Sequence, residues 1–272
     1  MSKYIFIISL FFSISTQAQI ISSKDFTADY QTKALKIYRD TIAMRTAKGH
    51  DQVKIMAHYL ADRFRDGGFD DNDINVIPFI SPNGEEIASL VVRYRGDGSS
   101  GKKPILFAAH MDVVDALRKD WVKDPFTLIE EDGYFFGRGT SDDKFGTTLL
   151  TAAFLRLKNE NFMPNRDLII AFSGDEETEM LTIEDLIANH RALIDAEFAI
   201  NADSGGGSLS TEFEPISYQL QAAEKTYADF IISITNPTRP IFVRVLRYFI
   251  CLLYTSDAAD DLLCVDLGGR RI

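Results

Sequence analysis

The sequence contains very little cysteine. Cys251 and Cys264 are its only cysteines, and both lie near the C-terminal end of the 272 residues. A disulfide framework and a catalytic cysteine are therefore excluded for the body of the protein. This scarcity is compatible with export, because a domain of this size can bury a sufficient core without disulfides.

Excess positive charge and long apolar segments are also absent. The formal net charge is −11, so the surface would repel the phosphates of a nucleic acid, and we expect no nucleic-acid partner. No segment beyond the first residues is long and apolar enough to cross a bilayer, so we expect no membrane span. The composition, 46% hydrophobic and 25% charged, is typical of a globular protein with one large domain or two smaller ones. An acidic chain of this kind can bind divalent cations.

The first residues have the pattern of an export signal. Lys3 precedes an apolar run over residues 4–12, and the sequence Thr-Gln-Ala at residues 16–18 offers a cleavage site. The alternatives are a buried strand and a short membrane anchor, but the run is too short to cross a bilayer. We therefore predict a signal peptide over residues 1–18 and a secreted or periplasmic mature protein.

The C-terminal end differs from the rest of the chain. Residues 241–254 mix apolar and basic side chains without a turn signal, and residues 255–272 show no amphipathic period. The last stretch resembles translated linker sequence; a genuine irregular C-terminal segment is the alternative. We interpret residues 239–272 as a non-native tail.

Helices and strands alternate along the body of the chain. A cap at 22–25 predicts a first helix that runs toward Lys48. The spacing of apolar residues predicts three further helices, at 53–64, 147–157 and 183–194. Apolar runs bounded by turn signals predict strands at 74–79, 89–94, 104–109, 126–130, 134–136, 168–172, 198–200, 216–222 and 228–234. This alternation predicts an α/β fold with a mostly parallel sheet flanked by helices.

Acidic and imidazole side chains follow three of these strands, and a further carboxylate pair precedes a helix. Ligand sites of open α/β sheets lie beyond the carboxyl ends of the strands, where these side chains fall. Their shared placement predicts a divalent metal site. The residues concerned are His110, Asp112, Asp142, Asp143, Glu176, Glu177 and Asp203.

Each of these features also has an ordinary structural explanation. A single histidine beside a strand, such as His110, is more often a hydrogen-bonded structural residue than a ligand. The acidic run 175–179 has the composition of a solvated surface, and Asp142-Asp143 stands where a helix cap would stand. Asp203 precedes a glycine-rich turn. A metal site is the interpretation that accounts for all of them together.

The order of these motifs resembles that of the M20 family of metallopeptidases. The stretches that carry the resemblance are His110-Met111-Asp112, Gly137-Arg138-Gly139-Thr140-Ser141-Asp142-Asp143-Lys144, Glu176-Glu177 and Asp203. The resemblance covers residues 26–237. The family includes secreted carboxypeptidases, dipeptidases, aminoacylases, acetylornithine deacetylase and succinyl-diaminopimelate desuccinylase. It implies the fold of a zinc-peptidase catalytic domain with an inserted α+β lid domain.

The resemblance also implies a centre with two zinc ions. His110 and Asp203 are the implied ligands of the first ion, and Glu177 is an implied ligand of the second. Asp142 is implied as the carboxylate that bridges both ions. The family further implies a cis peptide bond between Asp142 and Asp143.

Two more roles follow from the resemblance. Asp112 is implied to accept the second ring N–H of His110 and so to fix its tautomer. Glu176 is implied as the general base, which takes a proton from the attacking water and returns it to the leaving nitrogen. We therefore predict an exported zinc-dependent hydrolase that cleaves amide bonds of small peptides, of carboxypeptidase or dipeptidase type. The alternatives are an N-acyl amino acid deacylase of the same family and a metal-binding fragment without catalysis.

The family pattern ends near residue 238. Residues 19–226 correspond to the N-terminal part of the catalytic domain, and residues 227–238 to the start of the lid domain, with its first strand at 232–237. The family has a further metal-binding histidine after the lid, and none of the four histidines of this chain stands there. We therefore expect the chain as printed to be inactive, and a complete protein to form a homodimer through its lid.

Overall fold

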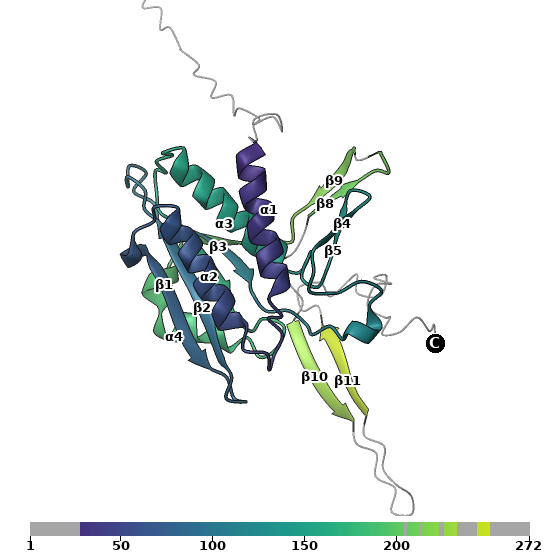
Figure 1. Cartoon of the computed structure of the whole chain (residues 1–272). Helices are drawn as coiled ribbons and strands as arrows, with labels where there is room; N and C mark the ends of the chain where they lie inside the picture. Colours follow the sequence, from purple (N-terminus) through teal and green to yellow (C-terminus); the bar gives the residue numbers. More distant parts are fainter. Residues whose placement is uncertain (1–27, 204–205, 213, 223–225, 233–243, 251–272) are drawn as a thin grey trace, which may run out of the picture. The chain divides into compact units, whose positions relative to one another are not determined.

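The computed structural model describes residues 28–203, 206–212, 214–222, 226–232 and 244–250 (Figure 1). The chain divides after Asp203 into two compact units. The predicted signal peptide at 1–18, and residues 239–243 and 251–272 of the predicted tail, lie outside the described residues. None of the helices in the described ranges is long and apolar enough to cross a membrane.

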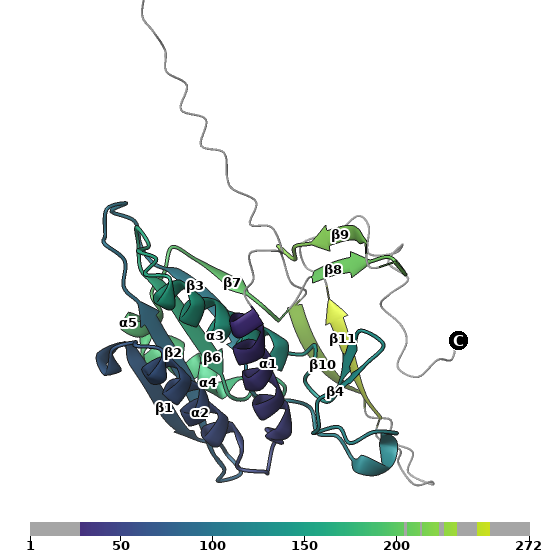
Figure 2. The same cartoon turned by 45° about the horizontal axis from the view of Figure 1, so that its top comes forward.

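The first unit is built on a five-stranded sheet. In spatial order its strands are β1 (Ile74–Ile80), β2 (Glu86–Tyr94), β6 (Leu168–Ser173), β3 (Ile105–His110) and β7 (Phe198–Asn201) (Figure 2). Only β2 runs against the other four, so the predicted α/β class is confirmed and the sheet is mixed. The reversal follows from residues 81–85, which are too few to form the crossover that parallel neighbours require.

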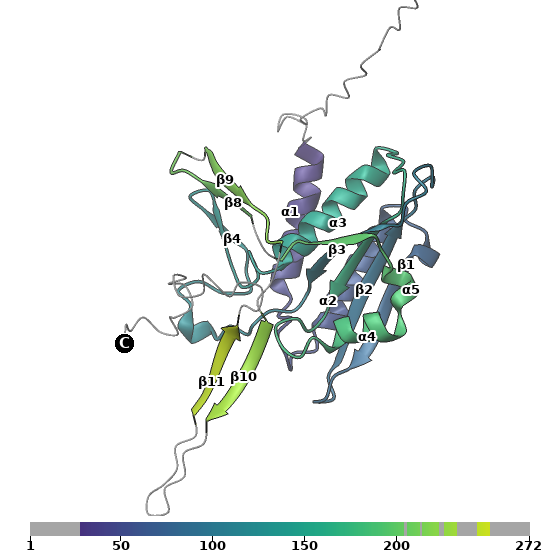
Figure 3. The same ribbon diagram turned by 180° about the vertical axis from the view of Figure 1, so that it is seen from behind.

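Helices cover both faces of this sheet. One face carries α1 (Ala28–Ala43), α2 (Val53–Asp66) and α3 (Lys144–Asn159), and the other carries α4 (Leu181–Asn189) and α5 (Arg191–Ile194), as the opposite views of Figures 1 and 3 show. The single helix predicted over 183–194 is thus two helices. They are separated at His190, whose φ of −125° lies outside the helical range.

The core lies between the sheet and α2. Four large apolar side chains of α2 are 2% exposed or less: Val53, Met56, Leu60 and Phe64. Their helical spacing places them on one face, and they share a cluster with the strand residues Ile74, Leu90, Val92, Ile170 and Phe172. Burying each of these four side chains stabilises the folded state by about 1.5–3 kcal/mol. Gly67 ends α2 where an added Cβ would lie 2.3 Å from the Leu155 side chain.

The predicted hairpin also forms. It consists of β4 (Ile129–Glu131) and β5 (Tyr134–Phe136), which pair antiparallel. Asp132 and Gly133 connect them with φ angles of 52° and 81°, the signs that a tight two-residue turn requires. Two short 3-10 helices, η2 (Asp71–Asp73) and η3 (Arg118–Asp120), complete the unit.

The second unit contains two antiparallel pairs. β8 (Gly206–Leu209) pairs with β9 (Pro215–Gln219), and β10 (Thr226–Ile232) pairs with β11 (Arg244–Ile250). β9 and β10 overlap the strands predicted at 216–222 and 228–234, whereas no strand was predicted at β8. β10 lies at the start of the lid region predicted at 227–238. Of the lid strand predicted at 232–237, only Ile232 lies within the described residues. β11 lies within the predicted tail at 239–272.

The register of the sheet places the candidate residues together. His110 pairs with Ser173 across the parallel strands β3 and β6, so the loop that carries Glu176 and Glu177 begins beside His110. On the other side Ala108 pairs with Asn201, and Asp203 follows two residues later. The three strand ends therefore meet at one edge of the sheet, as predicted for such a site.

Candidate metal centre

His110 lies at the centre of the site, with 1% of its side chain exposed. Its Nδ1 donates a hydrogen bond to the carbonyl oxygen of Asp112 at 3.0 Å and lies 3.4 Å from the Asp112 carboxylate. Its Nε2 lies 2.7 Å from Oδ1 of Asp142 and 3.5 Å from Oδ1 of Asp203. With Nδ1 engaged by Asp112, Nε2 is the ring atom that faces the other carboxylates.

Asp112 also fixes the loop that carries the two glutamates. Its Oδ1 accepts the backbone N–H of Glu176 at 3.0 Å, and its Oδ2 accepts that of Glu177 at 3.0 Å. The side chain is nearly inaccessible to solvent. Asp112 therefore orients the His110 ring mainly through its backbone carbonyl, and its carboxylate fixes the starting point of Glu176 and Glu177. The hydrogen bonds from the backbone N–H groups of Glu176 and Glu177 to Asp112 were not predicted from the sequence.

Asp142 and Asp143 are joined by a cis peptide bond, as the family resemblance implies, and their side chains have different surroundings. The Asp142 side chain is 60% exposed. Asp143 is fully buried and caps α3, because its Oδ1 accepts the N–H of Gly146 at 3.2 Å. Its Oδ2 accepts the N–H of His110 at 3.1 Å, so Asp143 joins the start of α3 to the end of β3.

Asp175 was not predicted as a functional residue. It is 4% exposed, and its carboxylate accepts the backbone N–H groups of Leu181 and Thr182 at 2.8 and 2.9 Å. These contacts begin α4 and close the loop that carries Glu176 and Glu177. The acidic run 175–179 gives no signal that would distinguish this buried carboxylate from its half-buried and exposed neighbours.

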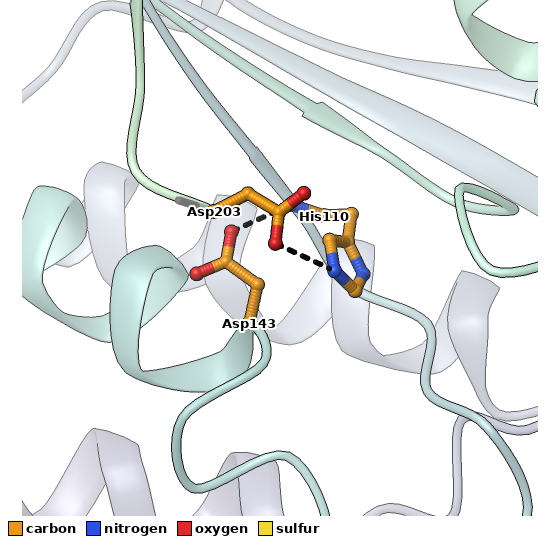
Figure 4. A group of neighbouring side chains, drawn as sticks. All are labelled: His110, Asp143 and Asp203. Carbon is orange, nitrogen blue, oxygen red and sulfur yellow. Dashed lines mark hydrogen bonds and ion pairs between the residues drawn. The ribbon is translucent and has the colours of Figure 1, made fainter. Parts of the chain in front are cut away.

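Asp203 approaches the site from the end of β7. Figure 4 shows its carboxylate and that of Asp143 turned toward His110 from different elements of the fold. The side chain of Asp203 is 22% exposed and that of Glu176 is 29% exposed. A cleft of about 320 Å³ lies beside them, and His110, Glu176 and Asp203 are among its lining residues. Solvent therefore has access to this side of the site.

The side chains form two overlapping sets of metal-ligating atoms. One set joins His110, Asp142 and Glu177, and the other joins His110, Asp143 and Asp203; the atoms of each lie within 4.8 Å of one another. No lysine or arginine of the described residues lies within ion-pair distance of Asp142, Asp143, Glu177 or Asp203. Concentrated negative charge without a basic partner, beside an imidazole, is the donor chemistry that divalent zinc requires.

The electrostatics of the metal-free site reflect this crowding. Burial alone would lower the pKa of His110, but the carboxylates of Asp112 and Asp203 raise it to about 12. Burial raises the pKa of Asp143 to about 7. Burial, with repulsion from nearby carboxylates, also raises the pKa values of Glu176 and Glu177. His110, in turn, holds the pKa of Asp203 below its ordinary value.

Comparison with known proteins identifies the family. Residues 106–238 match the model of peptidase family M20/M25/M40. This part of the chain belongs to the M20 peptidase family. The matched region begins in β3 and includes all of the predicted site residues, so the resemblance found in the motifs is confirmed.

Individual relatives agree with this assignment. The chain is 41% identical over 90 residues to a probable carboxypeptidase S-like 2 of Dictyostelium discoideum. The aligned region covers 33% of this chain and 17% of that protein. It is 30% identical over 181 residues to a probable succinyl-diaminopimelate desuccinylase of Staphylococcus aureus, which covers 66% of this chain and 42% of that protein. The chain thus spans less than half the length of these curated relatives.

A solved structure shows the same fold. The di-peptidase Dug1p of Saccharomyces cerevisiae matches with a TM-score of 0.57 and 21% identity, over 67% of this chain and 40% of that one. This likeness in fold agrees with the predicted α/β class, a sheet flanked by helices.

Proposed function

We propose that the complete protein is an exported, zinc-dependent hydrolase of the M20 type that cleaves amide bonds in small peptides. The observation that supports this proposal is the convergence of His110 with carboxylates from three parts of the chain at one edge of the sheet. The activity belongs to the whole protein, since this chain spans about two fifths of its longer-matching relative.

His110, Asp142, Glu177 and Asp203 are the residues that we propose hold the two ions. Asp142 is preferred to Asp143 because its exposed carboxylate has Oδ1 directed at His110. Both oxygens of the buried Asp143 already accept backbone hydrogen bonds. Asp143 therefore serves to place His110 and α3, and Asp142 is left to bridge the ions. Bound zinc supplies the acidity that makes water a nucleophile near neutral pH.

Glu176 is the proposed general base. Its Oε2 lies 4.0 Å from Nε2 of His110, close to the metal-ligating atoms. Burial and the neighbouring carboxylates raise its pKa, which makes it a stronger base than a glutamate in water. It takes the proton of the attacking water and returns it to the leaving nitrogen. Asp112 holds its backbone N–H, so the side chain extends from a fixed point.

The second candidate function is an N-acyl amino acid deacylase. The relative from Staphylococcus aureus, a probable desuccinylase, favours it, whereas the relative from Dictyostelium discoideum, a probable carboxypeptidase, favours peptide hydrolysis. In both reactions water attacks an amide carbonyl, and both need the same proposed site residues.

The experiment that tests the proposal uses the complete protein, continued with its own downstream sequence. Dipeptides and N-acyl amino acids are offered as separate panels, before and after removal of metal with a chelator. Hydrolysis of dipeptides that is lost with the metal and restored by zinc supports the proposal. Hydrolysis of the N-acyl panel alone supports the deacylase, and activity that survives complete metal removal contradicts both.

Export is part of the proposal and has its own test. The apolar run at 4–12 and the cleavage site at 16–18 support removal of residues 1–18. The mature protein is then expected to begin at Gln19 and to be found outside the cytoplasm. N-terminal sequencing of the cell-associated and exported fractions decides it, because an intact Met1 in the cytoplasm contradicts the proposal.

A further inference from the structure

The end of α1 and the loop after it contact the metal centre from outside the region matched to the M20 family. These residues, 38–46, are called here the 38–46 segment. Side chains join it to three stretches of chain, each of which carries or adjoins a residue of the site. The three connections have different chemistry.

The first connection is a tyrosine hydroxyl. Tyr38 donates a hydrogen bond from its hydroxyl to the carbonyl oxygen of Thr140 at 2.6 Å, two residues before Asp142. Tyr38 is 4% exposed, and its ring packs edge-on against Phe135 and Phe145. Burial raises the pKa of the hydroxyl to about 12, so it remains a donor at neutral pH. The loop before Asp142 is therefore fixed to α1.

The second connection is a buried lysine. Lys144 follows Asp142 and Asp143 directly, and its Nζ donates to the carbonyl oxygens of Thr41, at 2.8 Å, and of Met44. The side chain is 0% exposed. The last carbonyls of a helix have no partner within the helix, and a side-chain N–H can satisfy them. Burial lowers the pKa of Lys144 to about 7, so these hydrogen bonds, and not a permanent charge, make the contact. Lys144 thus binds the C-terminal end of α1 to the start of α3.

The third connection reaches β3. Thr46, which is fully buried, donates from Oγ1 to the carbonyl oxygen of Met111 at 2.7 Å. Its own carbonyl oxygen accepts the N–H of Val113 at 3.3 Å. These two contacts lie on either side of Asp112 along the chain. The 38–46 segment therefore contacts both the His110–Asp112 strand end and the Asp142 loop.

We propose that the 38–46 segment positions the metal-ligating side chains, holding Asp142 in register with His110 through Tyr38, Lys144 and Thr46. None of the three residues is a ligand in this proposal; each acts by fixing the backbone beside one. The proposal rests on the proposed function in one respect, because it takes these side chains to bind metal. A change in the segment is then expected to alter metal affinity as well as stability.

Two pairs of variants of the printed chain separate positioning from general stability. Tyr38→Phe removes the hydroxyl bonded to Thr140, and Tyr59→Phe removes a hydroxyl that bonds α1 at Asp40 instead. Thr46→Val removes the hydroxyl bonded to Met111 at nearly constant size, and Thr46→Ser retains it. Lys144→Met removes both lysine contacts; where this variant fails to fold, the tyrosine and threonine pairs decide the question.

Zinc affinity is measured by competition with a chelator, and amide hydrogen exchange over residues 137–146 is measured in the metal-free chain. Tyr38→Phe and Thr46→Val are expected to weaken zinc binding about tenfold or more, because residues that orient ligands have effects of that size. Both are expected to speed exchange at 137–146. Tyr59→Phe and Thr46→Ser are expected to match the unaltered chain in both measurements.

Two results overturn the proposal. One is that Tyr38→Phe and Thr46→Val bind zinc and exchange hydrogen like the unaltered chain. The other is that Tyr59→Phe has as large an effect as Tyr38→Phe, since the effect would then be a general loosening of α1. If the unaltered chain binds no zinc, the proposed metal centre fails, and hydrogen exchange at 137–146 alone decides whether the segment fixes that loop.

Discussion

The inner and outer sides of the metal centre are built differently. On the inner side His110, Asp112 and Asp143 are at most 4% exposed, and each oxygen of the two carboxylates accepts a backbone N–H. On the outer side the carboxylates of Asp142, Glu176 and Asp203 are 60%, 29% and 22% exposed.

This difference separates two tasks. Buried carboxylates whose oxygens are all hydrogen-bonded hold neighbouring backbone in place and have little freedom to bind anything else. These exposed carboxylates have no lysine or arginine partner among the described residues, and the one imidazole between them is itself a proposed ligand, so they are available to ions and water. Changes of the two inner carboxylates should therefore act on metal affinity indirectly, through geometry. Changes on the outer side should remove a proposed ion ligand, at Asp142 or Asp203, or the proposed general base, at Glu176.

The largest expected effect is on the outer side. Glu176→Gln in the complete protein should lower kcat by about 10³-fold, because loss of a general base costs about that much. Its zinc content should not change, since Glu176 is assigned to the water and not to an ion. The matched control is Glu179→Gln, a nearby exposed glutamate paired with Lys48, which should keep normal activity. A Glu176→Gln variant that loses its zinc would break the division between the two sides.

The next effect is on the inner side. Asp112→Asn should weaken zinc binding about 10- to 100-fold, because the neutral amide loses the charge beside His110 and cannot accept both glutamate N–H groups. The control is Asp115→Asn, an exposed carboxylate three residues away that pairs with Arg45. Competition with a chelator measures both. Equal affinities for the two variants would show that burial of Asp112 does not set the metal geometry.

The inner side should also tolerate no added atoms. A Cβ at Gly146 would lie 2.1 Å from Oδ1 of Asp143 and 2.9 Å from Cβ of Ala202. Gly146→Ala should therefore lower the free energy of unfolding by about 1–3 kcal/mol, as overpacking does. At Gly207 the nearest atom to an added Cβ is 3.4 Å away. Gly207→Ala should therefore change the free energy of unfolding by less than about 0.5 kcal/mol. Urea unfolding compares them, and a stable Gly146→Ala variant would mean that Asp143 can move.

The smallest expected effect is the pH dependence of metal binding. The pKa of His110 is raised to about 12 without metal, so its imidazole carries a proton at neutral pH that zinc must displace. Zinc affinity should therefore rise with pH, by about tenfold per unit for one proton between pH 6 and 8. The raised pKa values of Glu176 and Glu177 act in the same direction in acid. Calorimetry in buffers of different ionisation enthalpy counts the protons, and an affinity independent of pH would contradict the described electrostatics.

Periodicity and motif order predicted much of this molecule. The apolar spacing of α2 and the strand runs of β3 and β6 depend on local burial, which a sequence records directly. The strand ends then located His110 and Asp203, because parallel strands end at the same edge of a sheet. The reversed direction of β2 and the interruption at His190 depend on how chain segments meet and have no comparable local signal.

The internal roles of the acidic residues were harder to predict. Asp143 and Asp175 read as a helix cap and a solvated residue, yet one meets His110 and the other closes the glutamate loop. The partners of Asp175 lie only six and seven residues ahead, but nothing in the acidic run shows which of its carboxylates is buried. The contact of Asp143 with the N–H of His110 joins residues 33 positions apart, and such a contact leaves no spacing in the sequence. The same holds for the link from Thr46 to Met111, which are 65 residues apart.

The central claim is that Asp142, and not Asp143, holds the ions together with His110, Glu177 and Asp203. Anomalous diffraction at the zinc edge, from crystals of the complete protein grown with zinc, tests it directly. The account predicts two peaks that share Asp142 as a ligand, one also bonded to His110 and Asp203 and the other to Glu177. An ion ligated by Asp143, with Asp142 free in solvent, would contradict it.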